Sequence, residues 1–299
     1  MEKYLISIVG PTAIGKTSTS IALAKLHNCE IISADSRQFF KEMAIGTAKP
    51  DPQEMDGVPH HFVDFLSVQD PYTAGQFEKD AIAKIEELHQ NYNVAIMVGG
   101  SGLYVNAVTD GMDDIPSDIN LRETLNKELE ENGIVPLQLE LKRLDPEHYE
   151  FMDIHNPQRL IRAVEVCRLS SKTYTSFRNK KKKTRPFNII KIGLTAEREI
   201  IYDRINQRVD LMIEAGLVDE VKSLHELKSL NALQTVGYRE LFEHFEGLVT
   251  LDEAIENIKM NTRRFAKRQM TWFKKDKDTK WFDYKDTQQI KDYVASQLK

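Results

Sequence analysis

The chain has 299 residues, enough for one large domain or two smaller ones. Hydrophobic residues make up 41% of it and charged residues 29%, which allows a hydrophobic core beneath a well-solvated surface. The net charge of −5 argues against a protein that coats nucleic acid over its whole surface, but it leaves room for a local basic groove.

The two cysteines, Cys29 and Cys167, lie far apart and form no C-x-x-C pair. This excludes a disulfide framework and argues against a structural zinc site. The N-terminus, Met-Glu-Lys, leads directly into a predicted strand, without an apolar stretch long enough for a signal peptide or a membrane span. We therefore expect a cytoplasmic protein that does not bind membranes.

Residues 10–17 match the phosphate-binding loop pattern G-x-x-x-x-G-K-[ST]. They follow a predicted strand over residues 4–9 and open a predicted helix over residues 18–26, which is the context that the pattern requires. Free N–H groups there would bind a diphosphate or triphosphate, with a charge from Lys16 and a hydroxyl ligand for Mg²⁺ from Thr17. The predicted phosphate-binding residues are Gly10, Pro11, Thr12, Ala13, Ile14, Gly15, Lys16 and Thr17.

A second apolar run, residues 30–33, is followed by Asp35. In open α/β sheets, ligands bind outside the carboxyl ends of the strands, so Asp35 is a candidate general base or metal ligand. The alternative is that Asp35 only caps the start of a helix.

Helical spacing over residues 73–91, a strand over residues 94–98 and a Gly-Gly turn at residues 99–104 repeat the strand–turn–helix pattern. We therefore predict an α/β fold with a P-loop-type parallel sheet flanked by helices. His60 and His61 are adjacent, so on a strand they point to opposite faces, and we expect polar packing instead of a metal site.

The pattern changes after a breaker-rich segment, residues 109–117. Residues 119–169 show helical periods without a convincing strand, and a strand returns at residues 187–193. We therefore predict a P-loop core with C-terminal helices over residues 1–112 and 187–299, and an all-helical insertion over residues 113–186.

Three groups of basic residues stand out in this acidic chain. The first, residues 178–185, carries six positive charges and is either a nucleic-acid contact or a solvated loop. In the second, Arg204 and Arg208 lie four apart on a predicted helix and could clamp a phosphate, or form surface ion pairs. The third is a stripe of Arg264, Lys267 and Arg268, which indicates an anion-binding surface.

Several further motifs accompany the P-loop. They are Asp-Ser-Arg-Gln at 35–38, Gly-Thr-Ala-Lys-Pro at 46–50, Gly-Gly-Ser-Gly-Leu-Tyr at 99–104, Asp-Ile-His-Asn-Pro-Gln-Arg at 153–159, Gln-Thr-Val-Gly-Tyr-Arg-Glu at 234–240 and Thr-Arg-Arg-Phe-Ala-Lys-Arg-Gln at 262–269. In this order they resemble the tRNA dimethylallyltransferases, also called tRNA isopentenyltransferases. Ser101 stands where that family often has threonine, which keeps the hydroxyl but not the β-branch that fixes its rotamer.

The resemblance implies transfer of a dimethylallyl group from dimethylallyl diphosphate to the exocyclic N6 amine of the adenosine 3′-adjacent to the tRNA anticodon. Lys16, Thr17, Arg208 and Mg²⁺ would stabilise the leaving diphosphate, and Asp35 would accept the proton of the amine. The implied partners are the tRNA anticodon stem-loop and dimethylallyl diphosphate, and we expect a monomer. The substrate-binding residues carried over from the family are Asp35, Ser36, Arg37, Gln38, Ser101, Arg122, Gln158, Arg159, Leu160, Ile161, Arg162, Gln234, Thr235, Val236, Gly237, Tyr238 and Arg239.

Three other functions share some of these features. A P-loop kinase for a small molecule has the same loop, and an enzyme that prenylates free AMP or ADP has the same chemistry. The basic stretches favour a macromolecular acceptor over both. A non-catalytic RNA-binding module would need neither the P-loop nor Asp35.

Overall fold

The computed structural model describes residues 2–178 and 182–299. The chain forms two compact units, one made of residues 1–109 and 184–299 and the other of residues 110–183. We call them the α/β unit and the helical unit and describe each by itself. Among the described residues, no helix combines the length and the apolar character needed to cross a membrane.

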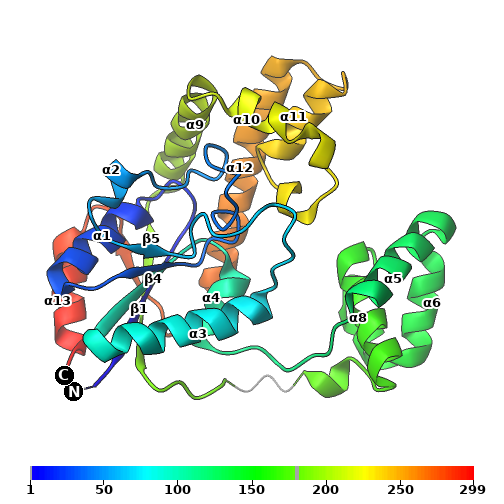
Figure 1. Cartoon of the computed structure of the whole chain (residues 1–299), viewed down its shortest axis with the longest axis horizontal. Helices are drawn as coiled ribbons and strands as arrows, with labels where there is room; N and C mark the ends of the chain where they lie inside the picture. Colours follow the sequence, from blue (N-terminus) through cyan, green and yellow to red (C-terminus); the bar gives the residue numbers. More distant parts are fainter. Residues whose placement is uncertain (1, 179–181) are drawn as a thin grey trace. The chain divides into compact units, whose positions relative to one another are not determined.

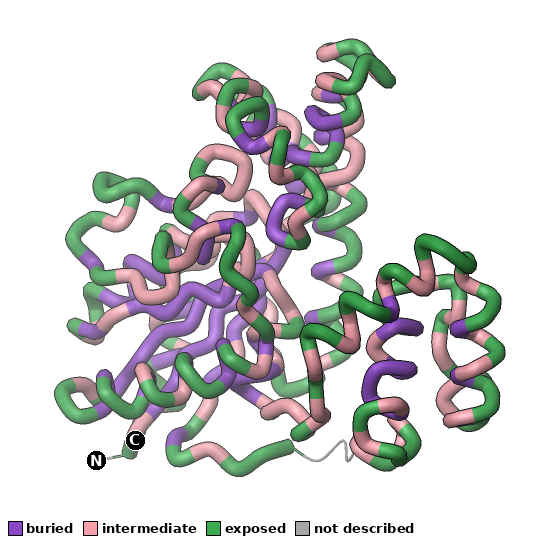
Figure 2. Tube along the Cα trace, turned by 45° about the vertical axis from the view of Figure 1, so that its right-hand side comes forward, coloured by how far each residue is buried: buried purple, intermediate pink, exposed green. Residues whose placement is uncertain are grey.

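The α/β unit is built on a sheet of parallel strands in the order β3-β2-β4-β1-β5-β6. They are β1 (Tyr4–Val9), β2 (Ile31–Ser33), β3 (His60–His61), β4 (Val94–Val98), β5 (Asn188–Thr195) and β6 (Lys280–Asp283). Figure 1 labels β1, β4 and β5 of this sheet. Every residue of β1 and β4 is buried, as expected for a parallel sheet with helices on both faces, and Figure 2 shows these strands inside the unit.

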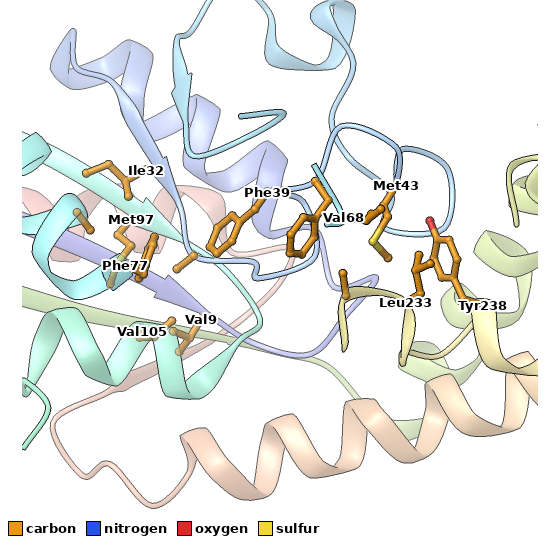
Figure 3. Close-up of a cluster of buried hydrophobic side chains, with 14 of the residues drawn as sticks. Val9, Ile32, Phe39, Met43, Val68, Phe77, Met97, Val105, Leu233 and Tyr238 are labelled. Atoms are coloured by element: carbon orange, nitrogen blue, oxygen red, sulfur yellow. The ribbon is translucent and has the colours of Figure 1, made fainter. Parts of the chain in front are cut away.

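Alternate strand residues pack into two separate hydrophobic cores, one on each face of the sheet. Leu5 lies in the core that includes Phe77 of α3 and Val105 of α4, part of which Figure 3 shows. Ile6 lies in the other core, with Ile21 of α1 and helix α13. The helices of this unit are α1 (Lys16–His27), α2 (Pro52–Met55), α3 (Ala74–Asn91), α4 (Gly102–Thr109), α9 (Arg198–Glu214), α10 (Leu217–Ser223), α11 (Tyr238–Phe245), α12 (Leu251–Phe273) and α13 (Thr287–Gln297), with 3₁₀ turns η2 (His225–Leu227) and η3 (Asn231–Leu233).

The carboxyl ends of β1, β2 and β4 are bonded to one another at a single edge of the sheet. Ala34 donates its N–H to the carbonyl of Val98 at 2.7 Å, and Gly99 donates to the carbonyl of Ile8 at 3.2 Å. The chain passes so close at Gly99 that a Cβ there would lie 2.4 Å from the backbone of Ala34. The loops after these three strands therefore meet in one place.

The helical unit contains α5 (Ile119–Asn132), α6 (Val135–Leu144), α7 (Pro146–Phe151), α8 (Pro157–Ser170) and the 3₁₀ turn η1 (Thr175–Phe177). Its core is formed by leucines of α5 and α6 and by the apolar face of α8, where Leu160 and Val164 are fully buried. This is a separate hydrophobic core from those of the sheet.

The predicted fold class is confirmed: the sheet is parallel, begins with the P-loop strand and is flanked by helices. The short edge strands β3 and β6 were not predicted, because two and four residues carry too little periodicity to recognise. The two histidines of β3 do bond separately, His61 to the carboxylate of Glu30 and His60 to the carbonyl of Val58.

Candidate active site

The P-loop connects β1 to α1 and depends on two glycines. Gly10 has φ 153° and Gly15, the N-cap of α1, has φ 102°. Both values are in the region that side chains with a Cβ rarely adopt. A Cβ on Gly10 would also lie 2.7 Å from the carbonyl oxygen of Leu194 in β5. The loop can therefore form only with glycine at this position.

Lys16 is the first residue of α1 and folds back over the loop. Its Nζ donates to the carbonyls of Gly10 at 3.2 Å and Pro11 at 2.8 Å. Burial lowers the pKa of Lys16 to about 8; the charge of Asp35 opposes this shift and that of Arg208 adds to it. Lys16 is thus a desolvated cation that an anionic ligand would stabilise.

Arg37 and Arg208 are also desolvated cations. Burial lowers the pKa of Arg208 on α9, although Asp35 attracts it, and burial also lowers the pKa of Arg37, against the opposing effects of Tyr104 and Asp35. Within the described part of the chain, the Arg208 side chain donates one hydrogen bond, a long one of 3.4 Å to the carbonyl of Ala48. For both arginines, the loss of hydration outweighs the attraction of nearby negative groups. A site with such cations is suited to a strong anion.

Arg204, which the sequence paired with Arg208, supports the loop itself. Its Nε donates to the carbonyl of Ala13 at 2.7 Å, and its guanidinium lies 5.0 Å from the ring centre of Tyr284. One arginine of the predicted pair therefore holds the P-loop backbone, and the other, Arg208, lines the cavity described below.

Asp35 follows β2 in a turn, and its Oδ1 accepts the N–H of Arg37 at 3.2 Å. The next helix, α2, begins only at Pro52, so the helix-capping alternative for Asp35 is wrong. The carboxylate acts on Lys16 and on both desolvated arginines. This position, at the joined strand ends, suits a general base.

A cavity of about 500 Å³ opens beside these residues. Asp35 is the only acidic residue among the described residues that line it, whereas Arg37, Arg208, Arg239 and Arg268 all do. Its apolar lining consists of Leu103, Tyr104, Ile205, Val209, Met212, Leu217, Val236, Ile258, Phe265 and Trp272. A cavity with both linings can hold a ligand that is apolar in one part and anionic in another. Another cavity, of about 410 Å³, includes Tyr4 at the start of β1 and none of the predicted site residues.

Ser36 and Ser101 line the cavity and bond to each other. The Ser101 hydroxyl accepts the N–H of Ser36 at 3.0 Å and lies 3.0 Å from its hydroxyl. Gln38 does not line the cavity; its amide donates to the carbonyls of Thr47 and Ala48 and accepts from the Ser33 hydroxyl. Gln38 therefore ties the Asp35 turn to the loop at residues 44–48.

Most of the predicted segment at residues 234–239 lines the cavity. Its lining members are Gln234, Thr235, Val236, Gly237 and Arg239. Tyr238 does not line it: this side chain is fully buried, and its hydroxyl donates to Glu220 at 2.6 Å. Its side chain is part of the core because α11 turns its apolar face inward.

In the helical unit the predicted tRNA contacts are of three kinds. The side chains of Leu160 and Ile161 are 0% and 2% exposed within the core, so they present nothing to a ligand. Arg122 and Arg162 both bond to the fully buried carboxylate of Glu165. Gln158 and Arg159, at the exposed start of α8, lie free of the core.

The residues of the basic run, 178–185, differ in their exposure and contacts. Residues 179–181 of the run lie outside the described residues. Arg185 is a structural residue with a side chain only 10% exposed, which bonds to Glu78 and to the carbonyls of Ala107 and Val108. Lys182 and Lys183 lie near Asp110 and Asp114. Among the described basic residues of the run, only Arg178 is exposed and forms no ion pair.

Gln269 on α12 is a site residue that sequence reasoning missed. Its Oε1 accepts the N–H of Thr12 at 2.8 Å, and its Nε2 donates to the carbonyl of Gly100 at 3.0 Å. One buried amide thereby joins the P-loop to the turn after β4. The signal was its spacing with Ala266 and Phe273, which places a polar side chain on the buried face of the helix.

Comparisons with known proteins identify the relatives of this chain. The family model described as IPP transferase matches residues 38–276. The chain is 56% identical to the tRNA dimethylallyltransferase of Christiangramia forsetii, covering 100% of this chain and 99% of that one. It is 55% identical to the enzyme of the same name from Flavobacterium johnsoniae, covering 99% of both chains.

Solved structures show the same similarity over the whole chain. The tRNA isopentenylpyrophosphate transferase of Bacillus halodurans matches with 40% identity and a TM-score of 0.73, covering 99% of this chain and 96% of that one. A eukaryotic dimethylallyltransferase acting on tRNA matches with 29% identity and a TM-score of 0.80, covering 99% of this chain and 77% of that one. The resemblance seen in the sequence motifs is confirmed, and the chain belongs to the IPP transferase family of tRNA dimethylallyltransferases.

Proposed function

We propose that this chain transfers the dimethylallyl group of dimethylallyl diphosphate to the N6 amine of the adenosine 3′-adjacent to a tRNA anticodon. The observation that carries the proposal is the meeting of Asp35 with three desolvated cations, Lys16, Arg37 and Arg208, beside a partly apolar cavity. A diphosphate ester with a short isoprenoid chain has the matching polarity, because one part is strongly anionic and the other is hydrocarbon.

The P-loop residues and Arg208 bind the diphosphate in this proposal. Lys16 exchanges its two carbonyl acceptors, on Gly10 and Pro11, for phosphate oxygens, which are stronger acceptors for a cation. Thr17 fits a Mg²⁺ ligand, since its hydroxyl lies at the start of α1 and has no hydrogen bond among the described residues. A Mg²⁺ held by the Thr17 hydroxyl would add to the neutralisation of the diphosphate charge.

Asp35 is the general base of the transfer step. The N6 amine attacks C1 of the dimethylallyl group, the C1–O bond breaks, and its electron pair leaves with the diphosphate. The proton of the amine passes to the Asp35 carboxylate, which has one oxygen bonded to the Arg37 N–H. Ser36, Arg37 and Ser101 line the cavity beside Asp35 and contact the adenosine.

The tRNA is bound by exposed polar residues of both units. The target adenosine must leave the stack to enter a cavity, which an anticodon loop allows at a lower cost than a duplex. Gln234, Thr235, Val236, Gly237 and Arg239 line the cavity that receives it, while Gln158 and Arg159 are exposed on α8 and contact the tRNA. Arg122 and Arg162 are paired with Glu165 and hold the helical unit together. The buried side chains of Leu160, Ile161 and Tyr238 hold their segments in place instead. The protein acts as a monomer.

A comparison of acceptors tests this function. The protein is incubated with dimethylallyl diphosphate and Mg²⁺, with unmodified tRNA, AMP, or ATP and candidate small acceptors, and the products are identified by mass. We expect a dimethylallyl group on one adenosine of the tRNA and no product with the other acceptors. Prenylated AMP without prenylated tRNA, or phosphate transfer from ATP, would contradict the proposal.

A further inference from the structure

Glu220 on α10 has an unusual set of partners and belongs to none of the sequence motifs. Its Oε2 accepts the backbone N–H groups of Ala44 at 2.9 Å and Ile45 at 2.7 Å. Its Oε1 accepts the N–H of Gly46 at 2.9 Å and the hydroxyl of Tyr238 at 2.6 Å. One carboxylate thus receives four hydrogen bonds, three of them from consecutive residues of a loop.

These bonds join two walls of the proposed active-site cavity. Gly46 and Thr47, on the bonded loop, line one side of it, and Val236 and Gly237, directly before Tyr238, line another. Figure 3 shows the Tyr238 side chain beside Met43, which precedes the loop, and beside Leu233. The contact is tight, since a Cβ on Gly46 would lie 2.6 Å from the Tyr238 ring.

The same loop is bonded to the turn that carries Asp35. Gln38 donates to the carbonyls of Thr47 and Ala48 from its position three residues after Asp35. Glu220 is therefore connected through loop 44–48 and Gln38 to the proposed general base. Ala48 also accepts the hydrogen bond of Arg208, so the loop is bonded directly to one proposed catalytic residue and through Gln38 to the turn of another.

Only a carboxylate satisfies this geometry. Three backbone donors and one hydroxyl need acceptors on both oxygens, whereas a glutamine would turn an NH₂ group toward one of the pairs of donors. Burial and the charge of Glu220 raise the pKa of Tyr238, which keeps its hydroxyl protonated as a donor. The arrangement fixes the loop, and neither Glu220 nor Tyr238 is among the residues that line the cavity.

We propose that Glu220 is a positioning residue for the transfer step. It holds loop 44–48 against α11 and so keeps the Asp35 turn in place relative to the accepting adenosine. It touches neither substrate. This inference rests on the proposed function, and it predicts an effect on the rate of transfer at saturating substrates, with little effect on the binding of dimethylallyl diphosphate.

The test compares Glu220→Gln with wild type in single-turnover transfer to tRNA, beside a titration with dimethylallyl diphosphate and a thermal melt. We expect the rate to fall roughly tenfold or more, because small displacements of reacting groups have effects of this size. The Kd for dimethylallyl diphosphate should stay within about twofold. Glu226→Gln is the matched control, since Glu226 is exposed and its loss removes the same charge without these bonds.

Tyr238→Phe keeps the ring and removes one of the four bonds, so it should lower the rate by a smaller factor, roughly threefold. This variant decides the question if Glu220→Gln does not fold. A wild-type rate per folded molecule with only a lowered melting temperature would reduce Glu220 to a stabilising role and overturn the inference. If wild type itself transfers nothing to tRNA, the proposed function fails, and the inference fails with it.

Discussion

Basic residues serve opposite purposes in the two units. In the α/β unit, Lys16, Arg37 and Arg208 are desolvated near the carboxylate of Asp35, and burial lowers the pKa of each cation. In the helical unit, Arg168 bonds to both Glu128 and Glu140, and these bonds raise its pKa.

The difference separates residues that bind ligands from residues that hold the fold. Arg122 and Arg162 follow the second pattern, because both reach the buried carboxylate of Glu165. An arginine whose charge is matched inside the protein gains little from an anionic ligand, whereas one left desolvated gains much. The desolvated cations of the α/β unit are therefore suited to bind an anion, and the paired cations of the helical unit mainly stabilise the structure of that unit.

The largest effect should come from Asp35, the one acidic residue among the described residues that line the cavity. Asp35→Asn keeps the size and the bond to the Arg37 N–H but cannot take the proton of the amine. We expect the single-turnover rate to fall by about 10² to 10⁴. Affinities for tRNA and diphosphate should change little.

Rate, binding and melting temperature measured together distinguish the roles of Asp35. A near-wild-type rate would end the assignment of Asp35 as the base. Loss of diphosphate binding with an altered dependence on Mg²⁺ would instead place it among the metal-binding groups.

The sequence predicted the parts of this site that depend on local pattern. The P-loop, the Asp35 turn and the parallel sheet follow from strands, glycines and polar residues that lie close together in the chain. It could not predict the pairing of side chains across long separations. Gln269 bonds to Thr12, 257 residues away, and Glu220 bonds to Ala44, 176 residues away. A pattern of neighbouring residues in the sequence cannot indicate either pairing.

The same limit explains the basic residues that were assigned to the wrong role. Arg204 and Arg208 share one helix face and look alike in sequence, yet only the fold shows that Arg204 bonds to the Ala13 carbonyl. Arg185 looks like part of a solvated basic run but is buried against Glu78. Which cations are paired is a tertiary property, and the contrast between the two units could not be read from charge patterns.

Arg208→Gln tests whether Arg208 binds the ligand and does not stabilise the fold. Burial outweighs the attraction of Arg208 to Asp35 and Glu54, so removing its charge should leave the melting temperature of the free protein unchanged or higher. The affinity for dimethylallyl diphosphate should fall roughly a hundredfold, since a desolvated charge-assisted contact is lost. A large loss of stability with unchanged diphosphate affinity would show that Arg208 belongs to the structural class.

Glu165→Gln tests whether the ion pairs of Arg122 and Arg162 stabilise the helical unit. Arg122 and Arg162 would lose their counter-charge, but each side chain is about a third exposed, so water recovers part of the loss. We expect the unfolding free energy of the helical unit to fall by about 2 kcal/mol, measured by denaturant titration. Glu123→Gln, an exposed position on the same helix as Arg122, is the control and should change little. Unchanged stability would remove the argument that these arginines are held by Glu165.

The smallest expected effect is the dependence of diphosphate affinity and of stability on pH. This dependence distinguishes the two units without a large structural change. Lys16 has a pKa of about 8 in the free protein, and a bound diphosphate must raise it, since an anion favours the cation. Above pH 8, binding requires uptake of a proton, so diphosphate affinity should fall by up to about tenfold per pH unit. The last ionisation of a phosphate, at about pH 6, is complete in this range and does not interfere.

The stability of the free protein should change in the opposite direction. Between about pH 8 and the usual lysine value of 10.5, the unfolded chain binds more protons at Lys16 than the folded one, so the unfolding free energy should rise with pH. Arg168, with its pKa raised by two carboxylates, does not titrate in this window, and the helical unit should show no such trend. Titrations with dimethylallyl diphosphate and denaturant between about pH 7.5 and 9.5 check both trends, and Lys16→Ala should abolish them. Diphosphate affinity that stays flat across this range would show that Lys16 is not the desolvated cation on which the contrast rests.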